Sequence, residues 1–133
     1  MTPWTRLELA HVVIRVAALD RMVGFYRDVL GLEVVQRQDA LGLVHLRAGS
    51  TRVDLLWIGG RLCRGGLAPD HARPNLDRLC LAVSPWDRAA VDAHLAKHCV
   101  AIDASRSGHG TSGEAPPLFL TDPEGNGVEI RPA

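Results

Sequence analysis

The chain has 133 residues, enough for one compact domain with a hydrophobic core. Its fifteen basic and fifteen acidic side chains cancel, which argues against a large binding surface for nucleic acid or a charged membrane. The sequence contains no run of about 18 apolar residues and no signal-peptide pattern, and its three cysteines favour reduced thiols, so we expect a cytoplasmic protein without a membrane span.

The first predicted elements are a strand over 8–16 and a helix over 20–30. Apolar and polar residues alternate along the strand with a period of two. One face is purely apolar and should pack against the helix, whereas the other face carries His11 and Arg15 and is not ordinary core. The helix has an apolar stripe, and Gly31 stands where a helix-ending glycine belongs.

Three more strands are predicted in the first half of the chain. Residues 32–38 and 42–48 form a hairpin, and 51–58 forms the next strand. In that last strand Asp54 lies on the polar face. His45, in the hairpin, could line a ligand site if its strand turns that face inward, but the expectation is an exposed side chain.

Residues 59–75 are rich in Gly, Pro and Arg and are interpreted as a linker. A strand over 76–83, a helix over 85–98 and a strand over 100–104 follow. A polar, glycine-rich loop then runs over 105–114 and is a candidate ligand-contacting segment.

The chain ends with a predicted hairpin over 118–121 and 127–131. Its turn, 122–126, has a proline where φ is preset and a glycine where a positive φ is needed.

An internal repeat relates the two halves of the chain. Residues 11–16 and 78–83 are alternating strands with a constant offset of 67 positions, and each is followed by an Asp-Arg pair that opens a helical pattern. Such repetition decides the architecture. It predicts a single α+β domain over 1–133, made of two copies of one β-α-β-rich module over 6–58 and 76–132. Two such half-sheets can enclose a ligand cleft.

Three motifs carry a resemblance to a known family. They are Leu-Ala-His-Val-Val-Ile-Arg-Val at 9–16, Phe-Tyr-Arg-Asp-Val-Leu-Gly-Leu at 25–32 and Asp-Pro-Glu-Gly-Asn-Gly-Val-Glu-Ile at 122–130. The chain resembles the vicinal oxygen chelate superfamily of glyoxalase I, fosfomycin-resistance proteins, bleomycin-resistance proteins and extradiol dioxygenases. The similarity spans roughly 6–132. It implies two βαβββ modules edge to edge, a cupped mixed sheet, and a divalent metal such as Ni, Zn, Mn or Fe.

The resemblance also implies which positions hold the metal. It places the first-strand histidine at His11, the fourth-strand position at or near Asp54, and the last-strand glutamate at Glu129. The remaining position, usually a histidine, is occupied by Arg78. A guanidinium stays protonated and has no lone pair to donate, so this position departs from the family pattern.

Two hypotheses follow from this departure. In one, Arg78 replaces the metal by bridging Glu129 and Asp54, and the protein is a metal-free binding or resistance protein for a small polar or anionic molecule. Asp54 is equally interpretable as half of a structural ion pair with Arg52 or Arg78. With either interpretation of Asp54, this first hypothesis needs no cofactor, whereas the second hypothesis keeps the divalent metal.

In the second hypothesis His11 and Glu129 hold the metal together with His71 or His109. Arg78 then binds the substrate, and the protein is a metal-dependent lyase, isomerase or dioxygenase in which Glu129 moves protons.

The predicted partners are a small-molecule ligand and a second copy of the chain. The candidate ligand-contacting residues are Arg78, Asp54, Leu56 and His109. A homodimer is expected because a cupped sheet leaves open edges. A third possibility is that the fold serves only as a scaffold or regulatory domain, since fold does not fix function.

Overall fold

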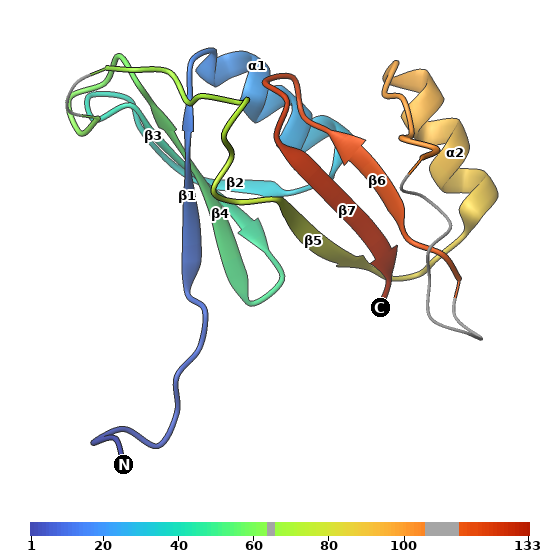
Figure 1. The fold of residues 1–133 in the computed structure, drawn as a ribbon, viewed down its shortest axis with the longest axis horizontal. Coiled ribbons are helices and arrows are strands. Elements are labelled where there is room, and N and C mark those ends of the chain that lie inside the picture. Colours follow the sequence, from blue (N-terminus) through green and yellow to red (C-terminus); the bar gives the residue numbers. More distant parts are fainter. Residues whose placement is uncertain (64–65, 106–114) are drawn as a thin grey trace. The chain divides into compact units, whose positions relative to one another are not determined.

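The computed structural model describes residues 1–63, 66–105 and 115–133. Their contacts divide the chain into two compact units, Met1–Ala68 and Pro69–Ala133, called unit 1 and unit 2 below. Each unit contains one β-sheet and its own helical segment (Figure 1). Within the described ranges, no helix is long and apolar enough to cross a membrane.

Unit 1 contains a four-stranded sheet in the order β1-β4-β3-β2. β1 pairs with β4 in parallel, and the other neighbours are antiparallel. The elements are β1 (His11–Val16), α1 (Leu19–Gly24), η1 (Phe25–Val29), β2 (Glu33–Gln38), β3 (Leu43–Ala48) and β4 (Thr51–Trp57). The predicted helix is therefore present, but its second half, η1, is a π-helical turn.

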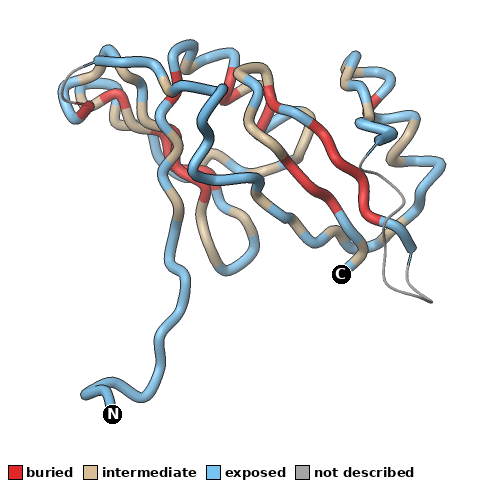
Figure 2. The backbone as a smooth tube through the Cα atoms, viewed as in Figure 1, coloured by how far each residue is buried: buried red, intermediate tan, exposed pale blue. Residues whose placement is uncertain are grey.

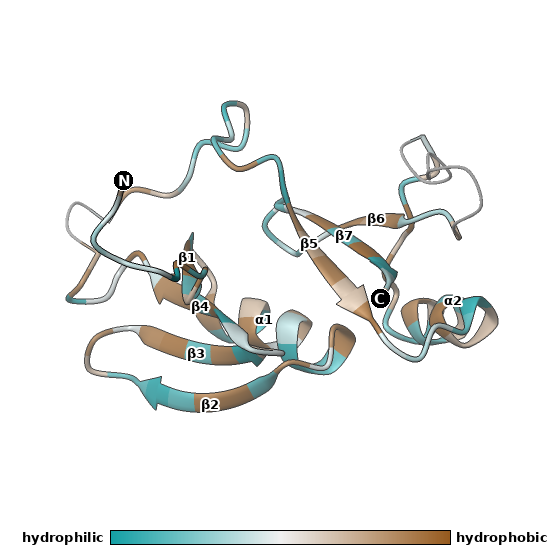
Figure 3. Cartoon of the chain, turned by 90° about the horizontal axis from the view of Figure 1, so that it is seen from below, coloured by the Kyte–Doolittle hydropathy of each residue, from teal (hydrophilic) through white to brown (hydrophobic). Residues whose placement is uncertain are grey.

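The core of unit 1 lies between one face of this sheet and the helical segment. α1 contacts β4, and Met22 and Leu55 are completely buried. Gly31 follows the helical segment with a φ of 77°, a conformation that glycine adopts without steric cost. Most buried residues of unit 1 lie in the helical segment, β3 and β4 (Figure 2), and Figure 3 shows polar positions between apolar ones along β3. The predicted alternation is confirmed in β1, whereas in β3 and in β4 three consecutive residues are buried, so both faces of these two strands are covered there.

Unit 2 contains a three-stranded sheet in the order β5-β7-β6. β5 pairs with β7 in parallel, and β6 pairs with β7 antiparallel. The elements are β5 (Arg78–Val83), α2 (Arg88–Lys97), β6 (Leu118–Thr121) and β7 (Gly127–Pro132). The helix starts later than predicted because the Asp87 carboxylate accepts a hydrogen bond from the Ala90 backbone N–H and so caps it.

The strand predicted over 100–104 is wrong. This segment joins β6 through one backbone hydrogen bond, from the Asp103 N–H to the Phe119 carbonyl at 2.8 Å, and has no strand assignment. A single bond does not build a ladder, so the apolar residues of this segment pack without extending the sheet. The α+β architecture itself is confirmed by the two mixed sheets.

The turn between β6 and β7 has the predicted form. Asp122 is 4% exposed, and its carboxylate accepts hydrogen bonds from the backbone N–H groups of Glu124 and Asn126 and from the Asn126 side chain. Gly125 has a φ of 88°. This turn fixes the register of β7, and with it the position of Glu129.

Candidate functional site

The face of the unit 1 sheet that lies opposite α1 carries a polar cluster. In the strand register His11 lies opposite Arg52, and His45 lies opposite Asp54. Because side chains alternate along a strand, these four project from the face opposite α1. β4 is the central strand of the cluster, with β1 and β3 on either side.

The negative charge of the Asp54 carboxylate is balanced by a cation within unit 1. Its side chain is 2% exposed, and Arg52 donates from Nε to Oδ1 at 3.1 Å and from Nη2 to Oδ2 at 2.9 Å. Such a two-point contact holds both partners in a fixed plane. Nη2 of Arg52 also lies 3.5 Å from Nδ1 of His11. The carboxylate therefore has its own cation, as in the structural ion pair with Arg52.

His45 is buried, and its predicted exposure is wrong. The residue is 8% exposed, and Nδ1 lies 2.9 Å from Oδ2 of Asp54. The geometry at the ring nitrogen does not make a hydrogen bond, so Nδ1 has no hydrogen-bond partner. In the antiparallel pairing of β3 with the central strand β4, His45 lies directly opposite the buried Asp54.

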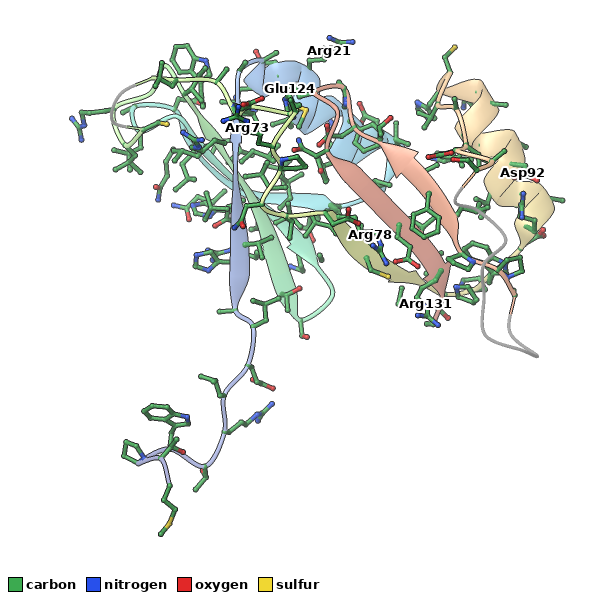
Figure 4. All side chains as sticks on the ribbon, viewed as in Figure 1. Arg21, Arg73, Arg78, Asp92, Glu124 and Arg131 are labelled. Atoms are coloured by element: carbon green, nitrogen blue, oxygen red, sulfur yellow. The ribbon has the colours of Figure 1, made fainter. Side chains whose placement is uncertain are left out.

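Unit 2 carries a comparable cluster around Glu129. In the register Cys80 and Phe119 both lie opposite Glu129. Arg78 donates from Nε to Oε2 of Glu129 at 3.0 Å and from Nη1 to Oδ2 of Asp77 at 2.6 Å. Its Cζ lies over the Phe119 ring, 5.3 Å from the centroid, a cation–π distance. Figure 4 shows Arg78 on β5 beside β7, which carries Glu129.

These contacts set the charge states of the cluster. Burial alone would raise the pKa of Glu129, but hydrogen bonds from Arg78 and Cys80 and the charges of Arg78 and Arg131 lower it overall. Glu129 is therefore ionised at neutral pH. Burial, followed by the hydrogen bond to Glu129, raises the pKa of the Cys80 thiol. Cys80 thus stays a thiol, which argues against a nucleophile.

The remaining candidate residues are dispersed. Leu56 is half-buried on the same face of β4 as Asp54. His71 is exposed in a turn, with its ring 3.9 Å from the place that a Cβ on Gly125 would occupy. It therefore lies beside the β6–β7 turn, before the strand that carries Glu129. His109 lies outside the described residues.

The donors present do not fit a divalent metal. Within 1–63, 66–105 and 115–133, no three His, Cys, Asp or Glu side chains gather in a way that could hold a metal ion. Glu129 is bound by Arg78, which has no lone pair, and its other neighbour is the protonated Cys80 thiol. Asp54 is likewise bound by Arg52. A metal would have to displace a guanidinium from each carboxylate.

The sequence analysis did not place His45 and Phe119 next to the two carboxylates, although the hairpin turns contain the information to do so. Ala48 pairs with Thr51 across the β3–β4 turn, so counting back from that turn places His45 opposite Asp54. The same count from the β6–β7 turn places Phe119 opposite Glu129. Hairpin register, rather than composition, identifies both neighbours.

Comparison with known proteins gives three findings beside the family model. The chain is 27% identical to mouse (Mus musculus) mitochondrial methylmalonyl-CoA epimerase over 133 residues, covering 96% of this chain and 72% of that protein. It is 28% identical to the catechol-2,3-dioxygenase of Bacillus subtilis, covering 95% of this chain and 41% of that enzyme. The chain thus spans less than half of the dioxygenase.

The fold of the chain is also similar to that of a solved structure. The trypanothione-dependent glyoxalase I of Leishmania major superposes with a TM-score of 0.69 at 26% identity, covering 96% of this chain and 87% of that chain. Residues 8–130 match the model of the Glyoxalase/Bleomycin resistance protein/Dioxygenase superfamily. That match covers nearly the whole sequence, and the chain therefore belongs to this superfamily.

Proposed function

We propose that this protein binds a small, uncharged, oxygen-bearing molecule at the sheet face of unit 2 and does so without a divalent metal. The observation that carries the proposal is the ion pair between Arg78 and Glu129, with Nε and Oε2 3.0 Å apart. It stands where the family resemblance places a metal ligand pair. The pair offers a hydrogen-bond donor beside an acceptor, which suits a ligand with a carbonyl next to a hydroxyl.

Charge balance supports an uncharged ligand over an anion or a metal. Around Glu129, the two carboxylates of Asp77 and Glu129 face the two guanidinium groups of Arg78 and Arg131. A divalent cation is held by an excess of anionic or lone-pair donors, and an anion by an excess of cations. Neither excess exists at this cluster.

The competing function is a metal-dependent lyase, isomerase or dioxygenase. Superfamily membership favours it, and so do the names of the relatives, an epimerase and a dioxygenase. In that case His11 and Glu129 would hold Ni, Zn, Mn or Fe together with His71 or His109. Arg78 would then leave Glu129 and contact the substrate.

Metal content distinguishes the two functions. Elemental analysis of the untagged protein should find almost no transition metal, and calorimetry should detect no uptake of Zn²⁺ or Ni²⁺ at the cluster. About one metal ion per chain, retained on dialysis, would overturn the metal-free function.

An engineered variant tests the geometry behind the proposal. Arg78→His removes the guanidinium and places an imidazole lone pair beside Glu129 and the Cys80 thiol, so Zn²⁺ uptake should appear. Arg88→His, at a half-exposed position of α2 beside Asp92, is the matched control and should bind more weakly. Equal uptake by both variants would contradict the arrangement around Glu129.

We also propose that the chain forms a homodimer. β1 and β5 are each the outer strand of their own sheet, and an uncovered edge strand favours pairing with another chain. Light scattering coupled to size-exclusion chromatography should give twice the chain mass. A monomer at every accessible concentration would overturn this proposal.

A further inference from the structure

We infer that the last turn of α2 binds an exchangeable transition-metal ion through the imidazole groups of His94 and His98. This helix carries neither of the two carboxylate clusters, and the inference is independent of the function proposed above (Figure 1). The site takes Ni²⁺ or Cu²⁺ with two protein ligands, and water molecules complete the coordination.

The two histidines stand four residues apart on one face of the helix. His94 lies inside α2 and His98 is its C-cap, and the His98 backbone N–H donates to the His94 carbonyl at 3.2 Å. Side chains at this spacing are neighbours on a helix surface. Their ring centroids are 4.7 Å apart, with an angle of 59° between the ring planes. Leu95 is buried and anchors this turn, whereas His94 is exposed and His98 is half-buried.

The separation of the rings matches two neighbouring ligands of one metal ion. A metal–nitrogen bond of about 2.0–2.1 Å, the length found for zinc, places the centroid of a bound imidazole about 3.2 Å from the ion. Two imidazoles at a right angle around the ion then have centroids about 4.5 Å apart, and two at the tetrahedral angle about 5.2 Å apart. The observed 4.7 Å is nearer to the right-angle value. The pair therefore suits the tetragonal geometry of Cu²⁺ and Ni²⁺ better than the tetrahedral geometry of Zn²⁺.

The position at the helix end also favours a cation. The aligned peptide dipoles give the C-terminus of a helix a partial negative charge, and His94 stands in this last turn. Lys97 is a cation of the same turn, but its side chain is long and exposed, so its ammonium group can extend into solvent. The terminal torsion of histidine is broad, and each ring can therefore turn to present a nitrogen to the ion.

The ion is held more loosely here than in a catalytic metal centre, which has three protein ligands. In the part of the chain that the structure describes, no third histidine, cysteine, aspartate or glutamate joins the pair in a group that could hold an ion. We therefore expect the metal to leave this site on dialysis against a chelator. Metal that the protein retains after such dialysis is bound elsewhere, so the site on α2 does not obscure the metal content of the Glu129 cluster.

Calorimetric titration of the untagged full chain with nickel chloride tests the site. The wild type should bind about one Ni²⁺ per chain, whereas Mg²⁺, which prefers oxygen ligands, should not bind. His98→Ala should weaken Ni²⁺ binding by at least about tenfold, because a single imidazole cannot chelate the ion. The matched control is His98→Ala/Ala96→His, at an exposed alanine of α2. It keeps two histidines on the helix but two residues apart, where they do not face each other, so it should bind as weakly as His98→Ala.

A second measurement locates the ion in the wild type. Six-coordinate Ni²⁺ is paramagnetic, and it should broaden the two-dimensional NMR signals of residues 94–98 before those of residues around Glu129. No uptake of Ni²⁺ by the wild type at about 1 mM, or no broadening in α2, overturns the inference. Uptake by His98→Ala or by the double variant that equals uptake by the wild type also overturns it. The titrations of Arg78→His and its control are carried out in the His98→Ala background, so that they report on the Glu129 cluster alone.

Discussion

Asp54 and Glu129 occupy matching positions in the two sheets, and each carboxylate is bound by an arginine. β4 lies between β1 and β3, as β7 lies between β5 and β6. Val13 is the register partner of Asp54 and Cys80 that of Glu129, and these partners are 67 positions apart, the offset of the sequence repeat. The arginine comes from the strand of the carboxylate itself in unit 1 and from a neighbouring strand in unit 2. Both repeats therefore contain an ion pair at this place, but the position of the arginine differs between them.

Removing Arg78 should destabilise the protein through the charge that it leaves behind. Glu129 is 7% exposed, so Arg78→Met leaves a buried carboxylate without its cation. We expect the free energy of unfolding to fall by more than it does on breaking an exposed ion pair, although the partial exposure of Arg78 limits the loss. The double variant Arg78→Met/Glu129→Gln should recover at least half of this loss. Urea unfolding followed by circular dichroism measures all three proteins.

The control for this experiment is Arg88→Met. Arg88 pairs with Asp92 at 2.9 Å on α2, but both side chains are about half exposed. Such a pair contributes less than about 0.5 kcal/mol. If Arg78→Met costs no more than Arg88→Met, the ion pair with Glu129 is not the compensating contact described above.

The pH dependence of stability should carry the signature of Glu129. Its pKa in the folded protein is lowered by Arg78 and Cys80 despite burial, so the folded state binds its proton less readily than the unfolded state. The contribution is therefore fully present above the unfolded pKa of about 4.3 and is lost as the pH falls through the lower folded value.

The measurement is urea unfolding at a series of pH values from about 6 to about 3. Wild-type stability should fall across the acid part of this range, and Glu129→Gln should make the curve flatter. Asp92→Asn, at a half-exposed carboxylate, is the control and should keep the wild-type slope. A Glu129→Gln curve parallel to that of the wild type would show that this carboxylate is not the titrating group.

His45→Phe should be neutral or stabilising by up to about 1 kcal/mol. The imidazole is buried with Nδ1 lacking a hydrogen-bond partner, and removing an unsatisfied polar atom relieves its desolvation cost. The matching position of unit 2 already holds a phenylalanine, Phe119, opposite Glu129. His45→Ala instead leaves a cavity and should cost about 2–3 kcal/mol.

Thermal unfolding of the two variants measures this difference. A loss above about 1 kcal/mol in His45→Phe would mean that the contact of Nδ1 with Asp54 is a charged pair that stabilises the fold. In that case the charge of Asp54 is needed for the effect. In an Asp54→Asn background, His45→Phe should therefore change the free energy of unfolding much less.

The sequence predicted the faces of the strands better than the contacts on them. Period-two alternation identified the core side of β1, because burial of one sheet face requires it, but in β4 Asp54 is as buried as its neighbours Val53 and Leu55. The arginine that binds each carboxylate was not predictable in this way. Asp54 is paired by Arg52 from its own strand, and Glu129 by Arg78 from a neighbouring one, a choice that depends on rotamers and cross-strand geometry.

The ends of the helices and strands were predicted less accurately, because they depend on interactions that local sequence patterns do not encode. Proline at position 85 suggested an early helix start, but the capping bond of Asp87 moved the start to Arg88. The apolar residues over 100–104 suggested a strand, yet the segment has no strand assignment, although the Asp103 N–H donates to the Phe119 carbonyl of β6. Pairing along a whole ladder, rather than apolar character, decides whether such a segment is a strand.

Two glycines at the ends of α1 and η1 should respond to alanine in opposite directions. Gly24 has helical backbone angles, and a Cβ there would meet only Oδ2 of Asp28 at 3.9 Å, so Gly24→Ala should stabilise by about 0.5–1 kcal/mol. Gly31 has a φ of 77° with no atom within 4 Å of a Cβ, so Gly31→Ala should cost about 1–2 kcal/mol through backbone strain alone. Thermal unfolding measures both, and each variant serves as the control for the other. Equal stability of Gly31→Ala and the wild type would show that the chain after η1 relaxes to a negative φ, which would also shift the start of β2.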